Sequence, residues 1–204
     1  METTPLERQA GHLAPQDLYS LEDYDRRRPE FRARIMAHKE TRKVPIGPNA
    51  TLYFEDRLTM QYQVQEMLRI ERISDAGGVA DELKVYNALV PEGSNWKATF
   101  MVEFPDVEER RQALAQLKGI ERRVWMRVAG FDPVYAIADE DLEREDETKT
   151  SAVHFMRFEL TPDMCRAVRD GAAIGAGIDH PSYRHAVEAI APAVRDSLAR
   201  DLTG

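Results

Sequence analysis

FEDRLTMQYQVQEMLRIERI, residues 54–73, decides the first half of the fold. Its apolar residues recur at the three- and four-residue spacing of one helix face: Met60, Val64, Met67 and Leu68. Asp56 is placed to cap the start of this helix, and Gly77 and Gly78 are placed to end it. The sequence therefore predicts one long amphipathic helix, around which the other N-terminal elements pack.

A second stripe on the same helix is polar throughout: Glu55, Thr59, Tyr62, Glu66 and Arg69. One interpretation is a solvated face with pairs inside the helix, such as Glu66–Arg69. The alternative is a face turned inward onto a ligand, because a row of Thr, Tyr and Glu is a poor choice for solubility alone. Tyr62, Glu66 and Arg69 are therefore candidate binding residues.

Composition sets the broad class of the chain. The 204 residues are 43% hydrophobic and 31% charged, which is typical of a globular protein of one domain or one and a half. The net charge of -8 argues against wholesale binding of nucleic acids or membrane surfaces. The polar start and the lack of an apolar run of about 20 residues favour a soluble cytoplasmic protein. The single cysteine, Cys165, excludes an internal disulfide and CxxC motifs.

The N-terminal part is expected to be helical. Residues 1–15 form a loose tail, and Ser20 caps a helix that reaches about Lys43 with a break at Pro29. Between residues 26 and 43 basic side chains outnumber acidic ones. One interpretation is a solvated face, and the alternative is a surface that binds phosphate groups. Residues 43–46 and 50–54 form a hairpin, and residues 79–89 form another helix.

The second half predicts a sheet. Strands are expected at residues 96–104, 123–128, 134–137, 152–160 and 172–178, with helices starting after Asp106 and Thr161. The βαββαβ order favours an α+β fold with a ferredoxin-like antiparallel sheet, covered by the N-terminal helical segment and the short hairpin. Residues 16–204 would then form a single domain, with a helical and hairpin part at 16–92 and a sheet part at 93–204.

The strongest candidate for chemistry is AGIDHPSYRHAVE, residues 176–188, which gathers Asp179, His180, Tyr183, Arg184 and His185. Pro181 is expected to start a short helix after a strand, with Tyr183, Arg184 and His185 on its first turns. Two imidazoles and a carboxylate are ligands for a divalent metal such as zinc or iron.

His154 and Glu66 would complete the ligand set if the long helix covers that end of the sheet. The alternative is purely structural, with Asp179 and His180 as caps, Arg184–Glu188 as a pair, and His154 as a hydrogen-bonded core residue.

Three other features are weaker. Gly171, Gly175 and Gly177 follow a helix instead of opening one, which excludes a dinucleotide-binding turn. Cys165 lies near a helix start, but without an evident His partner it is expected to be a small buried residue. The acidic residues 139–147 are expected to form an exposed loop, with contact to a basic surface as the alternative.

Several long segments carry a resemblance: FEDRLTMQYQVQEMLRIER at 54–72, PDVEERRQALAQLKGIE at 105–121, YAIADEDLERE at 135–145, and VHFMRFEL at 153–160 followed by AGIDHPSYRH at 176–185. Together they resemble a bacterial family of uncharacterised proteins, domain of unknown function 3501, from about Leu18 to the end. The resemblance implies a context: rubrerythrin-type di-iron proteins and iron–sulfur oxidoreductases as companions, through neighbouring genes. The chain itself lacks the cysteines of a cluster and the paired Glu-x-x-His helices of a di-iron bundle.

Two main hypotheses follow. The first is an accessory protein of a redox or oxidative-stress system, which contacts partner proteins through the acidic residues 139–147 and the basic first helix. The second is a metal-dependent or small-molecule-binding enzyme that combines the residues around His180 with the polar stripe. Nucleic-acid binding is disfavoured, and self-association stays open.

Overall fold

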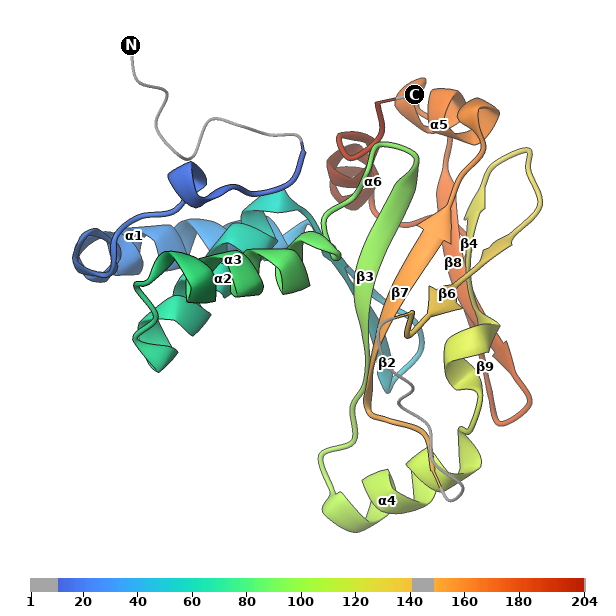
Figure 1. Ribbon diagram of the computed structural model, residues 1–204. Helices are drawn as coiled ribbons and strands as arrows, with labels where there is room; N and C mark the ends of the chain where they lie inside the picture. Colours follow the sequence, from blue (N-terminus) through green and yellow to red (C-terminus); the bar gives the residue numbers. More distant parts are fainter. Residues whose placement is uncertain (1–10, 141–148, 204) are drawn as a thin grey trace. The chain divides into compact units, whose positions relative to one another are not determined.

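The computed structural model describes residues 11–140 and 149–203, in two compact units (Figure 1). Unit 1 comprises residues 1–41 and 55–92, and unit 2 comprises residues 42–54 and 93–204. Unit 1 ends at residue 92, and the hairpin that precedes the long helix belongs to unit 2.

Unit 1 is helical. It contains η1 (Pro15–Asp17), α1 (Leu21–Glu40), α2 (Arg57–Glu71) and α3 (Ala76–Asn87). The predicted caps are confirmed, because Ser20 accepts a bond from the Asp23 N–H, and Asp56 accepts one from the Thr59 N–H. Thr59 Oγ1 in turn accepts from the Asp56 N–H at 2.9 Å, so the start of α2 is closed reciprocally.

Two expectations about helix ends were wrong. Pro29 lies inside a continuous α1, where buried Phe31 and Ile35 keep the following turns packed although the proline offers no N–H. Gly77 and Gly78 do not end α2, which stops at Glu71 with Arg72 in the left-handed region at φ 55°. They lie in the first turn of α3, because the Asp75 carboxylate caps the Gly78 N–H.

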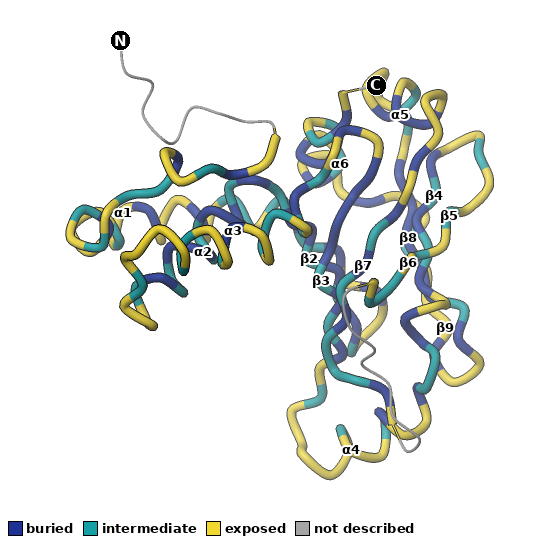
Figure 2. The backbone as a smooth tube through the Cα atoms, viewed as in Figure 1, coloured by how far each residue is buried: buried dark blue, intermediate teal, exposed yellow. Residues whose placement is uncertain are grey.

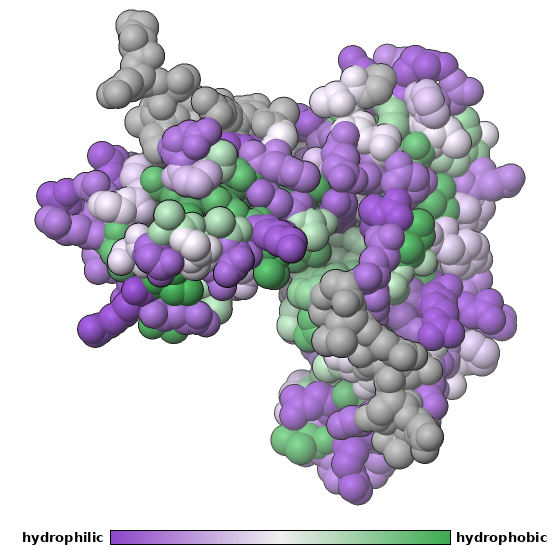
Figure 3. Space-filling view, in the orientation of Figure 1, coloured by the Kyte–Doolittle hydropathy of each residue, from purple (hydrophilic) through white to green (hydrophobic). Residues whose placement is uncertain are grey.

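Two apolar clusters hold unit 1 together. The apolar stripe of α2 packs with α3, through Met60, Val64, Leu68, Leu83 and Val90. A second cluster is centred on α1, through Tyr24, Phe31 and Ile35. Figure 3 shows hydrophilic residues over most of the visible surface of both units, with apolar groups between the helices of unit 1.

Unit 2 contains two antiparallel sheets. Its strands are β1 (Lys43–Pro45), β2 (Ala50–Glu55), β3 (Asn95–Val102), β4 (Val124–Val128), β5 (Val134–Tyr135), β6 (Ile137–Ala138), β7 (Val153–Glu159), β8 (Ile174–His180) and β9 (Tyr183–Val187). The helices are α4 (Val107–Gln116), η2 (Ile120–Arg123), α5 (Pro162–Arg169) and α6 (Pro192–Ala199). One sheet has the order β1-β2-β3-β7-β6 and the other β5-β4-β8-β9.

The α+β class is confirmed, whereas a ferredoxin-like strand order is not. A single sheet was expected, but β3 pairs with β7 in one sheet and β4 pairs with β8 in the other. The chain passes between the sheets at Ala136, because β5 pairs with β4 and β6 pairs with β7. The predicted hairpin of β1 and β2 extends the five-stranded sheet instead of covering it.

The mainly aliphatic core of unit 2 contains a group of packed aromatic rings. Trp96, Phe54 and Phe158 are buried, and Trp96 Nε1 donates to the Leu198 carbonyl at 3.0 Å. Figure 2 colours β3 as buried along most of its length. The guanidinium of Arg42, which is 2% exposed, binds the Asp201 carboxylate. Among the described residues, no helix combines the length and apolarity needed to cross a membrane.

Candidate functional site

The polar stripe of α2 faces α1. Glu66 accepts hydrogen bonds from the Tyr24 hydroxyl at 2.6 Å and from Arg28 Nε and Nη2 at 2.7 and 2.9 Å. These bonds from Arg28 hold the pKa of Glu66 below its ordinary value of 4.5, although burial opposes the shift. Burial and the Glu66 carboxylate together raise the pKa of Tyr24 well above its usual range. The carboxylate is therefore held as an ion by α1.

The neighbours of Glu66 on the stripe also reach α1. The ring of Tyr62 packs edge-on against Phe31, with 5.9 Å between the ring centroids. Arg69 Nε donates to the Asp25 carboxylate at 2.8 Å. Within unit 1, these residues of the stripe therefore neither face solvent nor line a ligand site. They form the polar part of the contact between α1 and α2.

A further polar row of α2, not singled out in the sequence, holds the segment around η1. Arg57 pairs with the Asp17 carboxylate at 2.7 Å, and Gln61 Nε2 donates to the Asp17 carbonyl at 2.6 Å. Gln65 Oε1 accepts from the Tyr19 N–H at 2.6 Å. The four-residue spacing of Arg57, Gln61 and Gln65 was a visible signal, but the sequence does not show which segment they bind.

The segment predicted to open a helix after Pro181 is a β-hairpin, which corrects that expectation. β8 and β9 pair with His180 opposite Tyr183, so Pro181 and Ser182 form the turn. Proline suits this turn position, and the alternation of inward and outward side chains suits a strand. Tyr183, Arg184 and His185 therefore alternate between two sheet faces instead of lining one helical turn.

On the inward face, His180 and Tyr183 are engaged in structural contacts. His180 Nε2 lies 3.0 Å from the Lys118 carbonyl, and its Nδ1 accepts from the Ser182 N–H at 3.2 Å. The Tyr183 hydroxyl donates to the Ile46 carbonyl at 2.8 Å and accepts from the Asn49 N–H at 2.9 Å. Both residues thereby fasten the hairpin to neighbouring loops.

Close contacts also surround the exposed His185. Its ring lies 4.6 Å from that of Tyr183, centroid to centroid. Gly47, at φ 74°, leaves room for both rings, because a Cβ there would come within 2.5 Å of the His185 ring.

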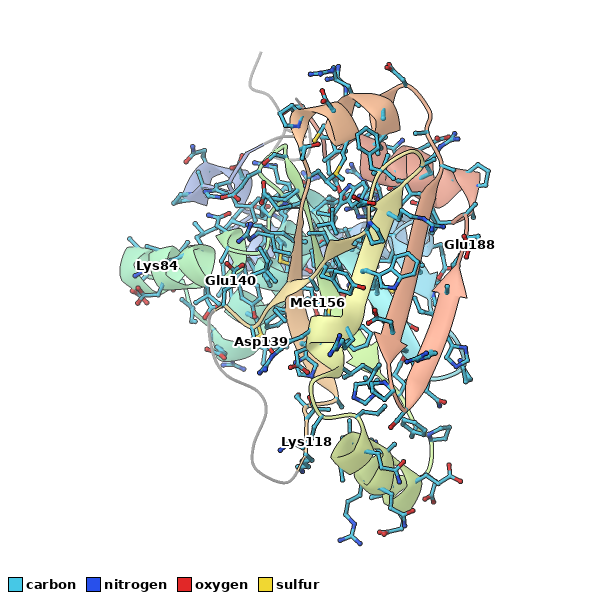
Figure 4. All side chains as sticks on the ribbon, turned by 90° about the vertical axis from the view of Figure 1, so that its right-hand side faces the viewer. Lys84, Lys118, Asp139, Glu140, Met156 and Glu188 are labelled. Atoms are coloured by element: carbon cyan, nitrogen blue, oxygen red, sulfur yellow. The ribbon has the colours of Figure 1, made fainter. Side chains whose placement is uncertain are left out.

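His154 lies in a separate buried network. Its side chain is fully buried, and its Nδ1 pairs with the Asp139 carboxylate. The Thr150 hydroxyl lies 3.0 Å from the Nε2 atom of His154, and Glu121 lies 3.4 Å beyond that hydroxyl. Figure 4 shows Asp139 where the chain leaves the sheet. The segment 141–148, which includes most of the predicted acidic loop, lies outside the described residues.

The predicted metal ligands do not come together within unit 2. In the described part of the chain, no group of three or more His, Cys, Asp or Glu side chains could hold a metal ion. His154, His180 and His185 therefore do not form such a group. Tyr62, Glu66 and Arg69 belong to unit 1 and the histidines to unit 2, so a site that combines the two sets stays a prediction.

The feature that sequence reasoning missed is the outward face of the four-stranded sheet, here called the open face. Its residues follow the register: Tyr135 lies beside Trp125, Trp125 beside Gly177, and Gly177 beside Ala186. The Trp125 ring covers Gly177, where an added Cβ would come within 2.2 Å of it. The alternation of Trp125 and Arg127 with buried Val124, Met126 and Val128 was the available signal.

Polar contacts tie the open face together. The Tyr135 hydroxyl, on a side chain that is 45% exposed, donates to Asp179 Oδ2 at 2.7 Å, and this bond raises the pKa of Tyr135. The Arg127 guanidinium lies 5.6 Å from the Trp125 ring centroid and pairs with Glu188. Of the predicted site residues, Asp179 and Arg184 therefore belong to this face.

A hollow of about 660 Å³ lies at one end of the open face. Its lining comes from β4, β8 and the turn after β4: Arg127, Ala129, Gly130, Phe131, Asp132, Ala173, Gly175 and Glu188. Glu188 follows β9 at the edge of the sheet (Figure 4). The combination of a cation, two carboxylates and an aromatic ring suits a polar ligand or an interacting side chain.

Comparisons with known proteins place this fold in a family. A structure from Burkholderia pseudomallei, described as a novel protein of unknown function, is 49% identical, with a TM-score of 0.89 over 95% of this chain and 100% of that chain. No curated protein matches the sequence. Residues 12–202 match the family model "Protein of unknown function (DUF3501)". The chain therefore belongs to the DUF3501 family.

Proposed function

We propose that this protein is an accessory protein that binds a protein partner through the open face of its four-stranded sheet. The observation that carries the proposal is the cluster of exposed Tyr135 with half-buried Trp125 and Arg127 on this face. Aromatic residues and arginine are enriched at the centres of protein interfaces, because they bury much surface while keeping one polar end. The Trp125 ring packs directly over Gly177, where a larger residue would collide with it.

The candidate partners are proteins of a redox or oxidative-stress system in the cytoplasm. The family resemblance supports rubrerythrin-type di-iron proteins and iron–sulfur oxidoreductases as the first to test. Charge would tune the encounter, through the exposed Arg32 and Arg34 of α1 and the acidic residues 139–147. Arg28 and Arg42 do not contribute, because both are engaged within their own units.

Binding of purified partner candidates to the immobilised protein tests the proposal. Trp125→Ala should weaken binding at least about tenfold, because a central aromatic residue is worth roughly 2 kcal/mol or more. Val107→Ala is the matched control, since Val107 is 67% exposed on α4, away from the open face. Equal binding by both variants, or no binding at low and high salt, would remove the open face as the contact surface.

A second candidate function is binding of a small molecule in the hollow beside Arg127, as a ligand-binding protein or enzyme. The volume of about 660 Å³ supports it, because ligand pockets commonly measure about 300–1,000 Å³. Arg127 and Glu188 together match a ligand that carries both a carboxylate and an amine. A thermal-shift screen with free amino acids tests this function. A rise in melting temperature that persists in Arg127→Gln would exclude the hollow as the binding site.

A further inference from the structure

β9 is the longest edge strand of the two sheets within the described residues. Among the described strands it ends the order β5-β4-β8-β9, and it is five residues long. The other edge strands, β1, β5 and β6, have three, two and two residues. Short edges offer little template for another strand, whereas a longer edge without proline presents a row of backbone groups. β9 is therefore the edge best suited to accept a further strand.

The register identifies which backbone groups face outward. His180 and Tyr183 close a two-residue turn as a hydrogen-bonded pair, and such pairs alternate along antiparallel strands. His185 and Val187 consequently direct their N–H and C=O groups to β8. Arg184 and Ala186 direct theirs to the open edge.

The side chains on this edge are complementary to themselves. If a second β9 lies antiparallel about Ala186, each Arg184 stands opposite a Glu188 of the other copy. Ala186 then faces Ala186, where the small side chains allow close approach. Opposite charges directly across a strand pair are favourable, and a register centred on Arg184 would put like charges together.

Both charged groups are available for this pairing. Arg184 is exposed, and no ion pair involving it is found in the described part of the chain. The Glu188 side chain is 79% exposed, and its contact with Arg127 leaves lone pairs for a second arginine.

We propose that β9 pairs with the β9 of a second copy of this chain, antiparallel about Ala186. The two four-stranded sheets then form one continuous sheet, with two open faces side by side. The contact is isologous, since the same residues serve on both sides of a two-fold axis. This proposal does not depend on the function proposed above.

Sedimentation equilibrium of the full chain tests the proposal, with a dimer as the expected result. The symmetric dimer contains two Arg184–Glu188 pairs, and either Arg184→Glu or Glu188→Arg alone turns both of them into pairs of like charge. Each single variant should therefore raise the dimer dissociation constant about tenfold or more. The double variant Arg184→Glu/Glu188→Arg restores opposite charges and should return it to within about threefold of the original. Arg111→Glu, which changes a charge on α4 instead, should leave it unchanged.

Cross-linking provides a second measurement that does not depend on charge. Residues in a hydrogen-bonded antiparallel pair lie about 5.5 Å apart at Cα, which a disulfide spans. Ala186→Cys in a Cys165→Ser background should therefore oxidise to a covalent dimer, and Val107→Cys in the same background should not. A chain that stays monomeric, a dimer that both charge reversals leave unchanged, or an edge filled only by another protein would overturn the proposal.

Discussion

Replacing Glu66 by alanine should destabilise unit 1 through one buried hydroxyl. The Glu66 carboxylate is the acceptor for the Tyr24 hydroxyl at 2.6 Å, and Tyr24 is 0% exposed. Glu66→Ala leaves that donor buried without its acceptor, which costs about 1–3 kcal/mol. The lost pair with Arg28 adds little, because water can hydrate that partly exposed guanidinium. The expected total is therefore about 1–3 kcal/mol.

The pH dependence follows from the lowered pKa of Glu66. The folded-state pKa lies below the ordinary value of 4.5, so the charged form stabilises the folded state above that pH. This contribution is lost as the pH falls through the folded-state pKa. The stability difference between the native protein and Glu66→Gln should therefore be full at neutral pH and shrink in acid below pH 4.5.

Urea unfolding followed by far-UV circular dichroism measures the loss, because unit 1 holds the long helices α1 and α2. Glu71→Gln is the control on the exposed end of α2, and its effect should stay within about 0.5 kcal/mol. In a Tyr24→Phe background, Glu66→Ala should cost about 1 kcal/mol less, because no buried donor is left unpaired. A loss below about 0.5 kcal/mol, or no coupling between the two positions, would refute the reasoning.

Three further outcomes are expected. Gly177→Ala should displace Trp125 and shift its fluorescence to longer wavelength, whereas the same change in a Trp125→Phe background should leave the emission of the remaining tryptophan unaltered. Gly47→Ala should lower stability by about 1–3 kcal/mol in urea unfolding, because its φ is 74° and the new methyl would meet His185; an unchanged midpoint would contradict this contact. Burial raises the pKa of the Cys165 thiol, so Ellman's reagent should label it slowly in the native protein and rapidly in denaturant, and fast native labelling would disprove its burial.

Local signals in the sequence were sufficient for the starts of most helices. Asp56, Asp106 and Thr161 each accept a bond from a nearby backbone N–H, as their position before a helical pattern predicted. A cap acts within one turn, so neighbouring residues decide it. The α+β class followed from the alternating strands of the second half for the same reason.

The candidate site was harder to predict. A stripe of polar residues identifies one face of a helix, but it does not identify the element that packs against that face. The polar stripe of α2 does face inward, yet Glu66 meets Arg28 and Tyr24, which lie 38 and 42 residues earlier. The hydrogen-bond partners of a side chain are set by packing between helices distant in sequence. Helical periodicity in the sequence therefore does not predict these hydrogen-bond partners.

The segment 176–188 shows the same limit for secondary structure. A proline followed by polar residues starts a helix or closes a hairpin equally well, and here pairing with β8 decides for the hairpin. The sequence by itself determined where most helices begin, which faces are apolar, and the mixed class of the fold. Only the tertiary structure decided which strands share a sheet, and hence that Trp125, Gly177 and Ala186 lie side by side. Pairing between distant strands depends on contacts across the whole unit, which no local stretch encodes.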